Sequence, residues 1–162
     1  MRFHLMTLQL ISMIALKEKL YQHCLGYIEQ RINTAEKAIA DAEEASRSET
    51  KSSAGDKYET GRAMMQQEID RNRTQLTEAG KIKHVLNQLN PNTQTTIIKH
   101  GSVAITDKGN FYLSISAGQL LIDGDNYYTI SPGSPIGMKL AGLEAGRSFD
   151  FNGQKFNIRE VF

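Results

Sequence analysis

The chain has 162 residues, a length that suits one ordinary domain or two small ones. Hydrophobic residues make up 40% and charged residues 23%, a balance typical of a folded protein and not of a disordered one. Nineteen basic and eighteen acidic side chains leave a formal net charge of +1, without the basic excess of a protein that grips nucleic acid along its own surface. We therefore expect no direct binding of duplex DNA.

The N-terminal segment is apolar from Met1 to Leu16. It is too short to span a bilayer, which needs ~20 apolar residues, and no small-residue cleavage site precedes the charged run Lys17–Lys19. We expect neither a membrane partner nor export. Because Met6 and Met13 are alternative starts, residues 1–12 are left open as an extension or a disordered lead.

Residues 13–90 contain no proline and predict two long helices. Apolar and small side chains recur at alternating steps of four and three, the spacing of a coiled-coil seam. These positions are Ile28, Ile32, Ala35, Ile39, Ala42 and Ser46 in the first run, and Met65, Ile69, Leu76, Ala79, Leu86 and Leu89 in the second. Asn72 and Lys83 occupy two seam positions with polar side chains. The two runs are predicted to pair as an antiparallel hairpin.

The tip of the hairpin is placed near residues 47–60, because residues 46–55 are rich in serine and threonine and end in glycine. Asp56 follows, and Glu59 comes three residues later. As a near match to a capping box, the two side chains would satisfy backbone N–H groups at a helix start. As carboxylates on one side of a first helical turn, they would offer oxygen ligands to Mg²⁺. Both interpretations stay open.

After Pro91, short β-prone runs alternate with glycine turns and predict an antiparallel sheet. The runs are residues 97–105, 110–116, 119–122, 127–130, 148–151 and 155–162. The turn Asn152–Gly153 between the last two favours type I′. The predicted fold class is α + β with two domains, residues 13–90 and 91–162.

One short helix is expected within the second domain. Ser134 can cap it, Pro135 suits its first turn, and Gly142 suits its end. The run from Ile130 to Arg147, followed by a hairpin that ends Phe-Asn-Ile-Arg-Glu-Val, resembles the C-terminal domain of the GreA/GreB transcript cleavage factors. The resemblance implies an FKBP-like fold for this half, and the family also places a helical hairpin before it.

The resemblance further implies a bacterial, cytoplasmic transcription elongation factor that binds RNA polymerase as a monomer. Its coiled coil would enter the secondary channel and meet nascent RNA only indirectly. In the family an acidic tip pair spaced Asp-x-x-Glu helps to hold the second magnesium of the polymerase, a role that falls here on Asp56 and Glu59. The chain would then activate cleavage of backtracked RNA without being an enzyme itself and without holding a cofactor stably.

Ser134 and Pro135 match the family's contact with the channel rim, and Arg62 is a further partner-binding candidate near the tip. The chain departs from the family at two points. Residues 60–63 read Thr-Gly-Arg-Ala where the family usually has Asn-Ala-Glu-Tyr, and Gly133 stands where it has an acidic or polar residue. Cleavage stimulation is therefore a weaker expectation than polymerase binding.

Three alternatives remain. The first is a regulator that occupies the channel without stimulating cleavage. The second is an FKBP-like prolyl isomerase or chaperone, which the absence of tryptophan and the few aromatic residues near the predicted helix disfavour. The third is a coiled-coil dimer with intermolecular seams.

Other reactive residues suggest no further chemistry. Cys24 is the single cysteine, so it cannot form an internal disulfide, and a reducing cytoplasm is the simplest compartment. His23 beside it does not make a dyad, because neighbours on a helix point about 100° apart. We expect a buried thiol on the hairpin seam. Arg71 and Arg73 add positive charge that could meet RNA phosphates.

Overall fold

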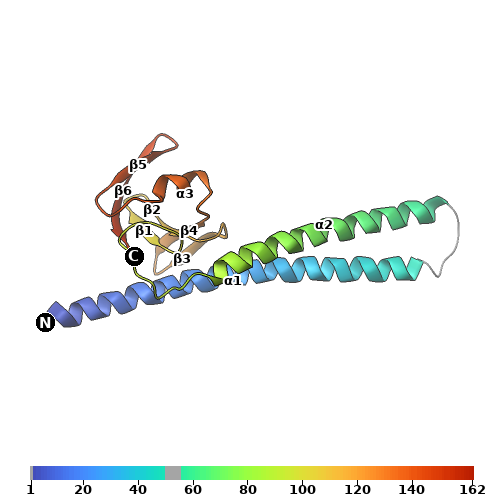
Figure 1. Ribbon diagram of the computed structural model, residues 1–162, viewed down its shortest axis with the longest axis horizontal. Helices are drawn as coiled ribbons and strands as arrows, with labels where there is room; N and C mark the ends of the chain where they lie inside the picture. The colour runs from blue at the N-terminus through green and yellow to red at the C-terminus, as the bar shows by residue number, and fades with distance from the viewer. Residues whose placement is uncertain (1, 50–55) are drawn as a thin grey trace. The chain divides into compact units, whose positions relative to one another are not determined.

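The computed structural model describes the backbone of residues 2–49 and 56–162 and the side chains of residues 6–48 and 59–162. The helices are α1 (Arg2–Glu49), α2 (Asp56–Asn87) and α3 (Pro135–Leu140) (Figure 1). The chain divides into two compact units. Residues 27–84 form the hairpin unit, and residues 1–26 with 85–162 form the sheet unit. This division differs from the predicted one at residues 13–90 and 91–162, because the first half of α1 belongs with the sheet.

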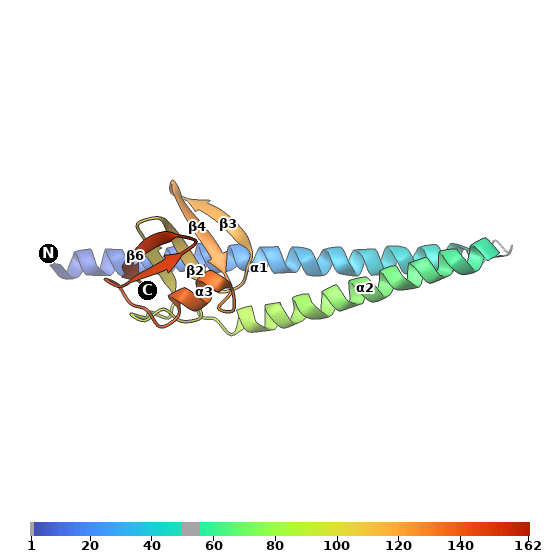
Figure 2. The same cartoon turned by 90° about the horizontal axis from the view of Figure 1, so that it is seen from above.

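In the hairpin unit, α1 and α2 run side by side in opposite directions (Figure 1 and Figure 2). The predicted seam is confirmed. Its buried members here are Ile28, Ala35, Ile69 and Ala79, and the half-buried ones are Ile32, Ile39, Ala42, Ser46, Met65 and Leu76. Alternate spacing of four and three thus brings one stripe of each helix into contact.

Both polar seam positions are satisfied by hydrogen bonds. Asn72 is 7% exposed, and its Nδ2 donates to the backbone oxygen of Glu68 and to Glu68 Oε1, each at 2.8 Å. Lys83 Nζ donates to Glu29 Oε1 at 2.8 Å across the two helices. A second ion pair between the two helices joins Arg73 of α2 to Glu43 of α1 at 3.2 Å. Partly exposed pairs of this kind contribute little stability, so the apolar stripe carries most of it.

The serine- and threonine-rich stretch of residues 46–55, which we used to place the tip, begins as helix, because α1 continues to Glu49. The Ser48 hydroxyl donates to the backbone oxygen of Glu44 at 3.1 Å, and Arg47 pairs with Glu43 at 3.7 Å. These contacts one turn apart extend the helix past its serine-rich end. Residues 50–55 of the predicted tip lie outside the described residues.

In the sheet unit, the described chain forms a six-stranded sheet in the order β3-β4-β2-β1-β6-β5. The strands are β1 (Val103–Thr106), β2 (Gly109–Leu113), β3 (Gly118–Ile122), β4 (Asp125–Ile130), β5 (Ser148–Phe151) and β6 (Gln154–Val161). The expected α + β architecture is confirmed: a helical pair precedes a mostly antiparallel sheet with one short helix. The expectation of a wholly antiparallel sheet needs one correction, since β2 and β4 pair in parallel.

The first predicted strand is also too long. Residues 97–102 are not part of β1, and Ile97 makes only an isolated bridge with Glu144. Gly101 has φ +93°, and its N–H donates to the Leu113 oxygen at 2.7 Å, so the chain turns before the strand begins. At the other end of the sheet, positive φ at Asn152 (50°) and Gly153 (74°) agrees with the predicted type I′ turn.

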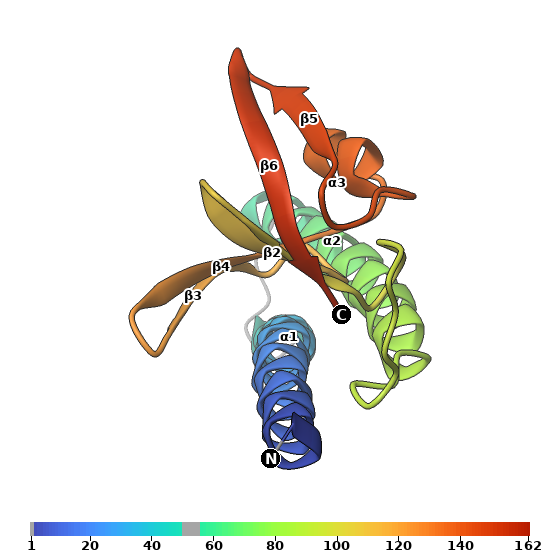
Figure 3. The ribbon, with the colours of Figure 1, turned by 90° about the vertical axis from the view of Figure 1, so that its left-hand side faces the viewer.

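The core of the sheet unit lies between α3 and the strands. Figure 3 shows α3 beside β5. Leu140 of α3 is fully buried in a cluster with Phe149, Phe156 and Ile158 of the C-terminal hairpin. Burial of such apolar side chains stabilises by about 1.5 to 3 kcal/mol each.

The first half of α1 packs on the same sheet. Leu20 and Cys24 are fully buried, and Cys24 Sγ lies 3.3 Å from Ser114 Oγ. The expected burial of the thiol is confirmed, but its neighbour is the segment after β2 and not the hairpin seam. Residues 2–12, left open as an extension or a disordered lead, belong to α1. Within the described chain, no helix is long and apolar enough to cross a bilayer.

Candidate functional site

The acidic pair lies at the start of α2, whose first residue is Asp56. Glu59 is exposed on the first turn. Residues three apart in a helix share a face, so the backbone places both positions on one side. The Asp56 side chain lies outside the described side chains, and its capping and metal-binding roles both remain predictions.

Magnesium holds a few carboxylates and several waters instead of a closed protein cage. A pair of carboxylates would therefore give an incomplete site that a second protein completes. Among the described residues, no group of three or more histidine, cysteine, aspartate or glutamate side chains could hold a metal by itself.

The positive charges near α2 differ in their surroundings. Arg62 is exposed one turn after Glu59. Arg71, in contrast, forms two hydrogen bonds with Glu68 at 2.7 and 2.8 Å. Hydrogen bonds from Asn72 and Arg71 hold the pKa of Glu68 below its usual range. Since Arg73 also has a carboxylate partner, Arg62 is the better candidate for contact with a phosphate or an acidic partner.

The predicted start of α3 is confirmed by its geometry. Ser134 has extended backbone angles (φ −69°, ψ 154°), and its Oγ accepts from the Gly137 N–H at 3.1 Å. The same hydroxyl donates to the Ser131 oxygen at 2.7 Å, and Pro135 fills the first turn. These bonds fix the Ser-Pro turn.

Part of this turn is available to a partner. Pro135 is exposed, and Met138 on the next turn is 64% exposed. Ser134 is half-buried because its hydroxyl serves the cap. A partner would therefore meet Pro135 and Met138 directly, and Ser134 acts mainly by holding their conformation.

The sheet unit also contains a cavity that we did not predict from the sequence. A cavity of about 280 Å³ lies beside α3. We call it the aromatic cleft, after the lining residues Phe111, Tyr128, Ile136, Phe151 and Phe156. Phe111 lies between Tyr128 and Phe156, with ring centroids 5.7 and 6.0 Å away, and Lys108 Nζ lies 5.7 Å from the Phe156 ring.

The expectation of few aromatic residues near this helix is therefore wrong. The rings come from strands distant in sequence, and only the sheet order brings β2, β4 and the β5–β6 hairpin together. The signal in the sequence was the aromatic residue in each of these strands, but it carried no information about which strands are neighbours.

Cys24 and its surroundings do not form a reactive centre. His23 Nε2 donates a hydrogen bond to the Ala117 backbone oxygen at 3.1 Å, whereas the Cys24 thiol interacts with the Ser114 hydroxyl. Burial raises the pKa of Cys24, and it also raises the pKa of Tyr112, whose buried hydroxyl has no partner in the described chain. A buried thiol with a raised pKa is a poor nucleophile.

The sequence matches no model of a known protein family, and a search of curated proteins finds no significant match. The resemblance to the GreA/GreB factors therefore stays a prediction from the motifs of residues 130–161, the acidic pair and the order of the two parts.

Proposed function

We propose that the protein is an RNA polymerase-binding transcription elongation factor of the GreA/GreB kind. Its helical hairpin enters the secondary channel, and Asp56 and Glu59 stimulate cleavage of backtracked RNA. The observation that carries the proposal is the combination of a hairpin whose second helix begins at Asp56 with a sheet unit that bears the Ser134–Pro135 turn. The resemblance implies the same two parts in the same order.

The acidic pair supports this function through its position. The free N–H groups at the start of α2 carry partial positive charge, which reduces the repulsion between two nearby carboxylates. Glu59 is exposed and so can reach a partner without unfolding the helix. The magnesium belongs to the polymerase, and its chemistry is to make a bound water more acidic and to stabilise charge on the phosphate. The chain's own part is to present oxygen ligands at the right place.

The Ser134–Pro135 turn supplies the docking contact in this proposal. The cap restricts Pro135 to one conformation before binding, which lowers the entropic cost of association. Arg62, near the tip acids, contacts RNA phosphates or acidic residues of the channel.

The experiment is RNA cleavage in stalled, backtracked complexes of the cognate polymerase. The test variant is Asp56→Asn/Glu59→Gln. Asparagine caps helices as well as aspartate does, and glutamine suits the capping box, so this variant removes metal-binding charge and keeps the cap. Glu36→Gln/Asp41→Asn is the matched control, since both residues are exposed on α1.

We expect stimulation by the wild type and the control and its loss in the test variant, with polymerase binding retained in all three. Binding without stimulation by the wild type would make the protein a channel-occupying regulator. No binding to polymerase would reject the proposal.

The aromatic cleft favours a second candidate function, an FKBP-like prolyl isomerase or chaperone. Apolar side chains and proline rings suit a cleft lined by aromatic faces. The full chain should be assayed for isomerisation of a prolyl peptide, with Tyr128→Ala as the variant. If the wild type catalyses the isomerisation and Tyr128→Ala does not, prolyl isomerase becomes the favoured function over elongation factor.

A further inference from the structure

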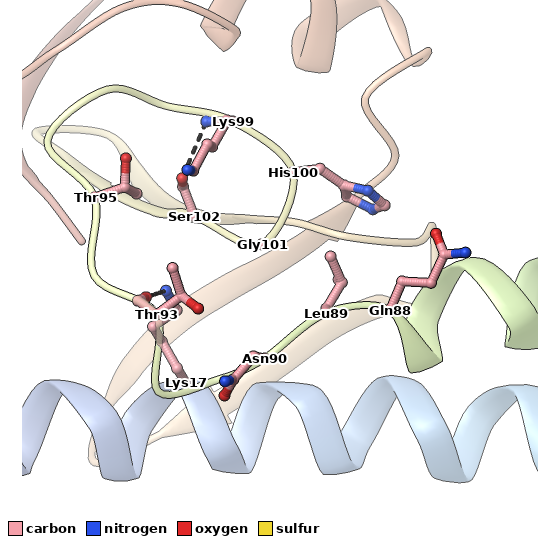
Figure 4. A pocket seen from close by; sticks show the side chains of 10 residues that line it. All are labelled: Lys17, Gln88, Leu89, Asn90, Thr93, Thr95, Lys99, His100, Gly101 and Ser102. Carbon is pink, nitrogen blue, oxygen red and sulfur yellow. Dashed lines mark hydrogen bonds between the residues drawn. The ribbon is translucent and has the colours of Figure 1, made fainter.

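Lys17 is a buried ammonium in the sheet unit. It lies on α1 and is 1% exposed, and its Nζ donates to the Thr93 backbone oxygen at 2.6 Å (Figure 4). Lysine is almost never fully buried unless it is paired with an opposite charge. In the part of the chain whose side chains are described, no carboxylate forms an ion pair with it.

The Lys17 side chain lines a cavity between α1 and residues 88–102. Figure 4 shows Lys17 rising from α1 toward Thr93, with Ser102 and His100 on the opposite side. The cavity has a volume of about 180 Å³, and its lining includes Lys99 but no aspartate or glutamate. Since a water takes roughly 30 Å³ in the liquid, this space holds a small polyatomic ion with a few waters.

The cavity offers several hydrogen-bond donors. An ammonium has three N–H groups, and Thr93 takes one from Lys17, so two remain. The Ser102 oxygen accepts from the Lys99 backbone N–H at 3.0 Å, which leaves the hydroxyl proton for another acceptor. The amide of Asn90 also lines the space.

The charges in the cavity repel one another. Burial, and then the positive charge of Lys99, lower the pKa of Lys17 to about 8. Lys17 therefore stays mostly charged at neutral pH, in a place that favours an anion.

We propose that this cavity is a binding site for a phosphate group, held by the ammonium groups of Lys17 and Lys99 and by the Ser102 hydroxyl. A phosphate group with two negative charges neutralises the positive charges of both lysines, whereas a carboxylate ligand would neutralise only one of them. The phosphate is either free inorganic phosphate or the end of a phosphate ester such as a nucleotide. The site is independent of the tip acids and of the proposed function.

A purely structural role for Lys17 predicts different behaviour. The bond from Nζ to the Thr93 oxygen alone would hold the segment after α2 against α1. In that case Lys17→Met would reduce stability. The cavity would bind no anion specifically, so Lys99→Met would not change anion binding.

The experiment is calorimetric titration of the full chain with inorganic phosphate, with adenosine 5′-monophosphate and with acetate, all at one ionic strength. The variants are Lys17→Met and Lys99→Met. Lys139→Met is the matched control, because Lys139 is exposed on α3, outside the cavity lining, and the variant makes the same change in net charge.

We expect saturable binding of phosphate and weaker binding of acetate. Each cavity variant should weaken phosphate binding by about tenfold, since hydrogen bonds to charged groups are among the strong ones, and Lys139→Met should leave it unchanged. Tighter binding of the nucleotide than of phosphate would identify an ester as the ligand, and equal or weaker binding would identify free phosphate.

The proposal is overturned if the wild type does not bind phosphate, if acetate binds equally well, or if Lys139→Met weakens binding as much as the cavity variants do. Should Lys17→Met fail to fold, Lys99→Met decides the question, because Lys99 is exposed and its loss leaves the fold intact. Unchanged binding in Lys99→Met would then reject the site.

Discussion

At the scale of single residues, Lys17 is a lysine whose side chain is almost fully buried. Burial of its ammonium, and then the positive charge of Lys99, disfavour the charged form. The pKa of Lys17 falls from its ordinary value of 10.5 to about 8 in the folded protein. The unfolded chain therefore holds more protons than the folded one between these two pH values.

The pH dependence of stability follows from this difference. Below about pH 8 the full penalty of burying a charge applies, and the penalty disappears as pH rises to about 10.5. Relative to Lys17→Met, the wild type should gain stability across this window, on the order of 3 kcal/mol in total. Urea denaturation at pH 7.5 and pH 10 in phosphate-free buffer measures the gain. If the difference in unfolding free energy between the wild type and Lys17→Met is the same at both pH values, the lowered pKa of Lys17 is contradicted. Lys139→Met serves as the control.

Gly137 is a second residue with a distinct local requirement. A Cβ placed there would clash with the Ser131 backbone oxygen and lie 2.9 Å from Ser134 Oγ. Gly137→Ala should therefore displace the Ser-Pro turn and reduce stability by about 1 to 3 kcal/mol. Gly133→Ala is the matched control, because its Cβ meets nothing within 4 Å, and it should be neutral or slightly stabilising. Thermal unfolding of both variants tests this, and equal melting temperatures would refute it.

At the scale of elements, the hairpin combines a simple apolar seam with two polar positions. Asn72 bonds within its own helix, whereas Lys83 bonds across to Glu29. The described hydrogen bonds of Asn72 thus satisfy its amide without linking the two helices, and a polar side chain in a seam costs stability. The hairpin thus gives up part of its apolar contact at Asn72.

Asn72→Leu should stabilise the hairpin by about 1 kcal/mol, because an apolar side chain replaces a polar one in the seam. Gln67→Leu, at an exposed position of α2, is the control and should change stability little. Urea unfolding followed by circular dichroism at 222 nm is the measurement. A loss of stability in Asn72→Leu would mean that the bonds to Glu68 contribute more than packing does.

At the scale of the whole molecule, α1 and α2 of one chain complete each other's seam. An intermolecular coiled coil is therefore unnecessary, and we expect a monomer of 18.1 kDa by light scattering. A mass of twice this value that depends on concentration would favour the dimer. The exposed side chains of Met6, Leu8, Leu10 and Ile11 on α1 would then be the first place to look for the interface.

Much of the fold was determined by the sequence itself. The seam from Ile28 to Ser46, the cap at Ser134 and the Asn152–Gly153 turn all depend on residues within a few positions of one another. Helical periodicity, capping and turn conformation are local properties, so a linear pattern is sufficient to predict them. The position of Asp56 at the start of α2 belongs to the same class.

Only the tertiary structure decided the rest. The parallel pairing of β2 with β4, the aromatic cleft and the contact of Lys17 with Thr93 join residues far apart in the chain. Lys17 appeared in the sequence as one member of a charged run, and nothing local indicated that it would be buried or that no carboxylate among the described side chains would pair with it. Burial and electrostatic environment depend on which segments meet, and the free energy of packing the whole chain decides that.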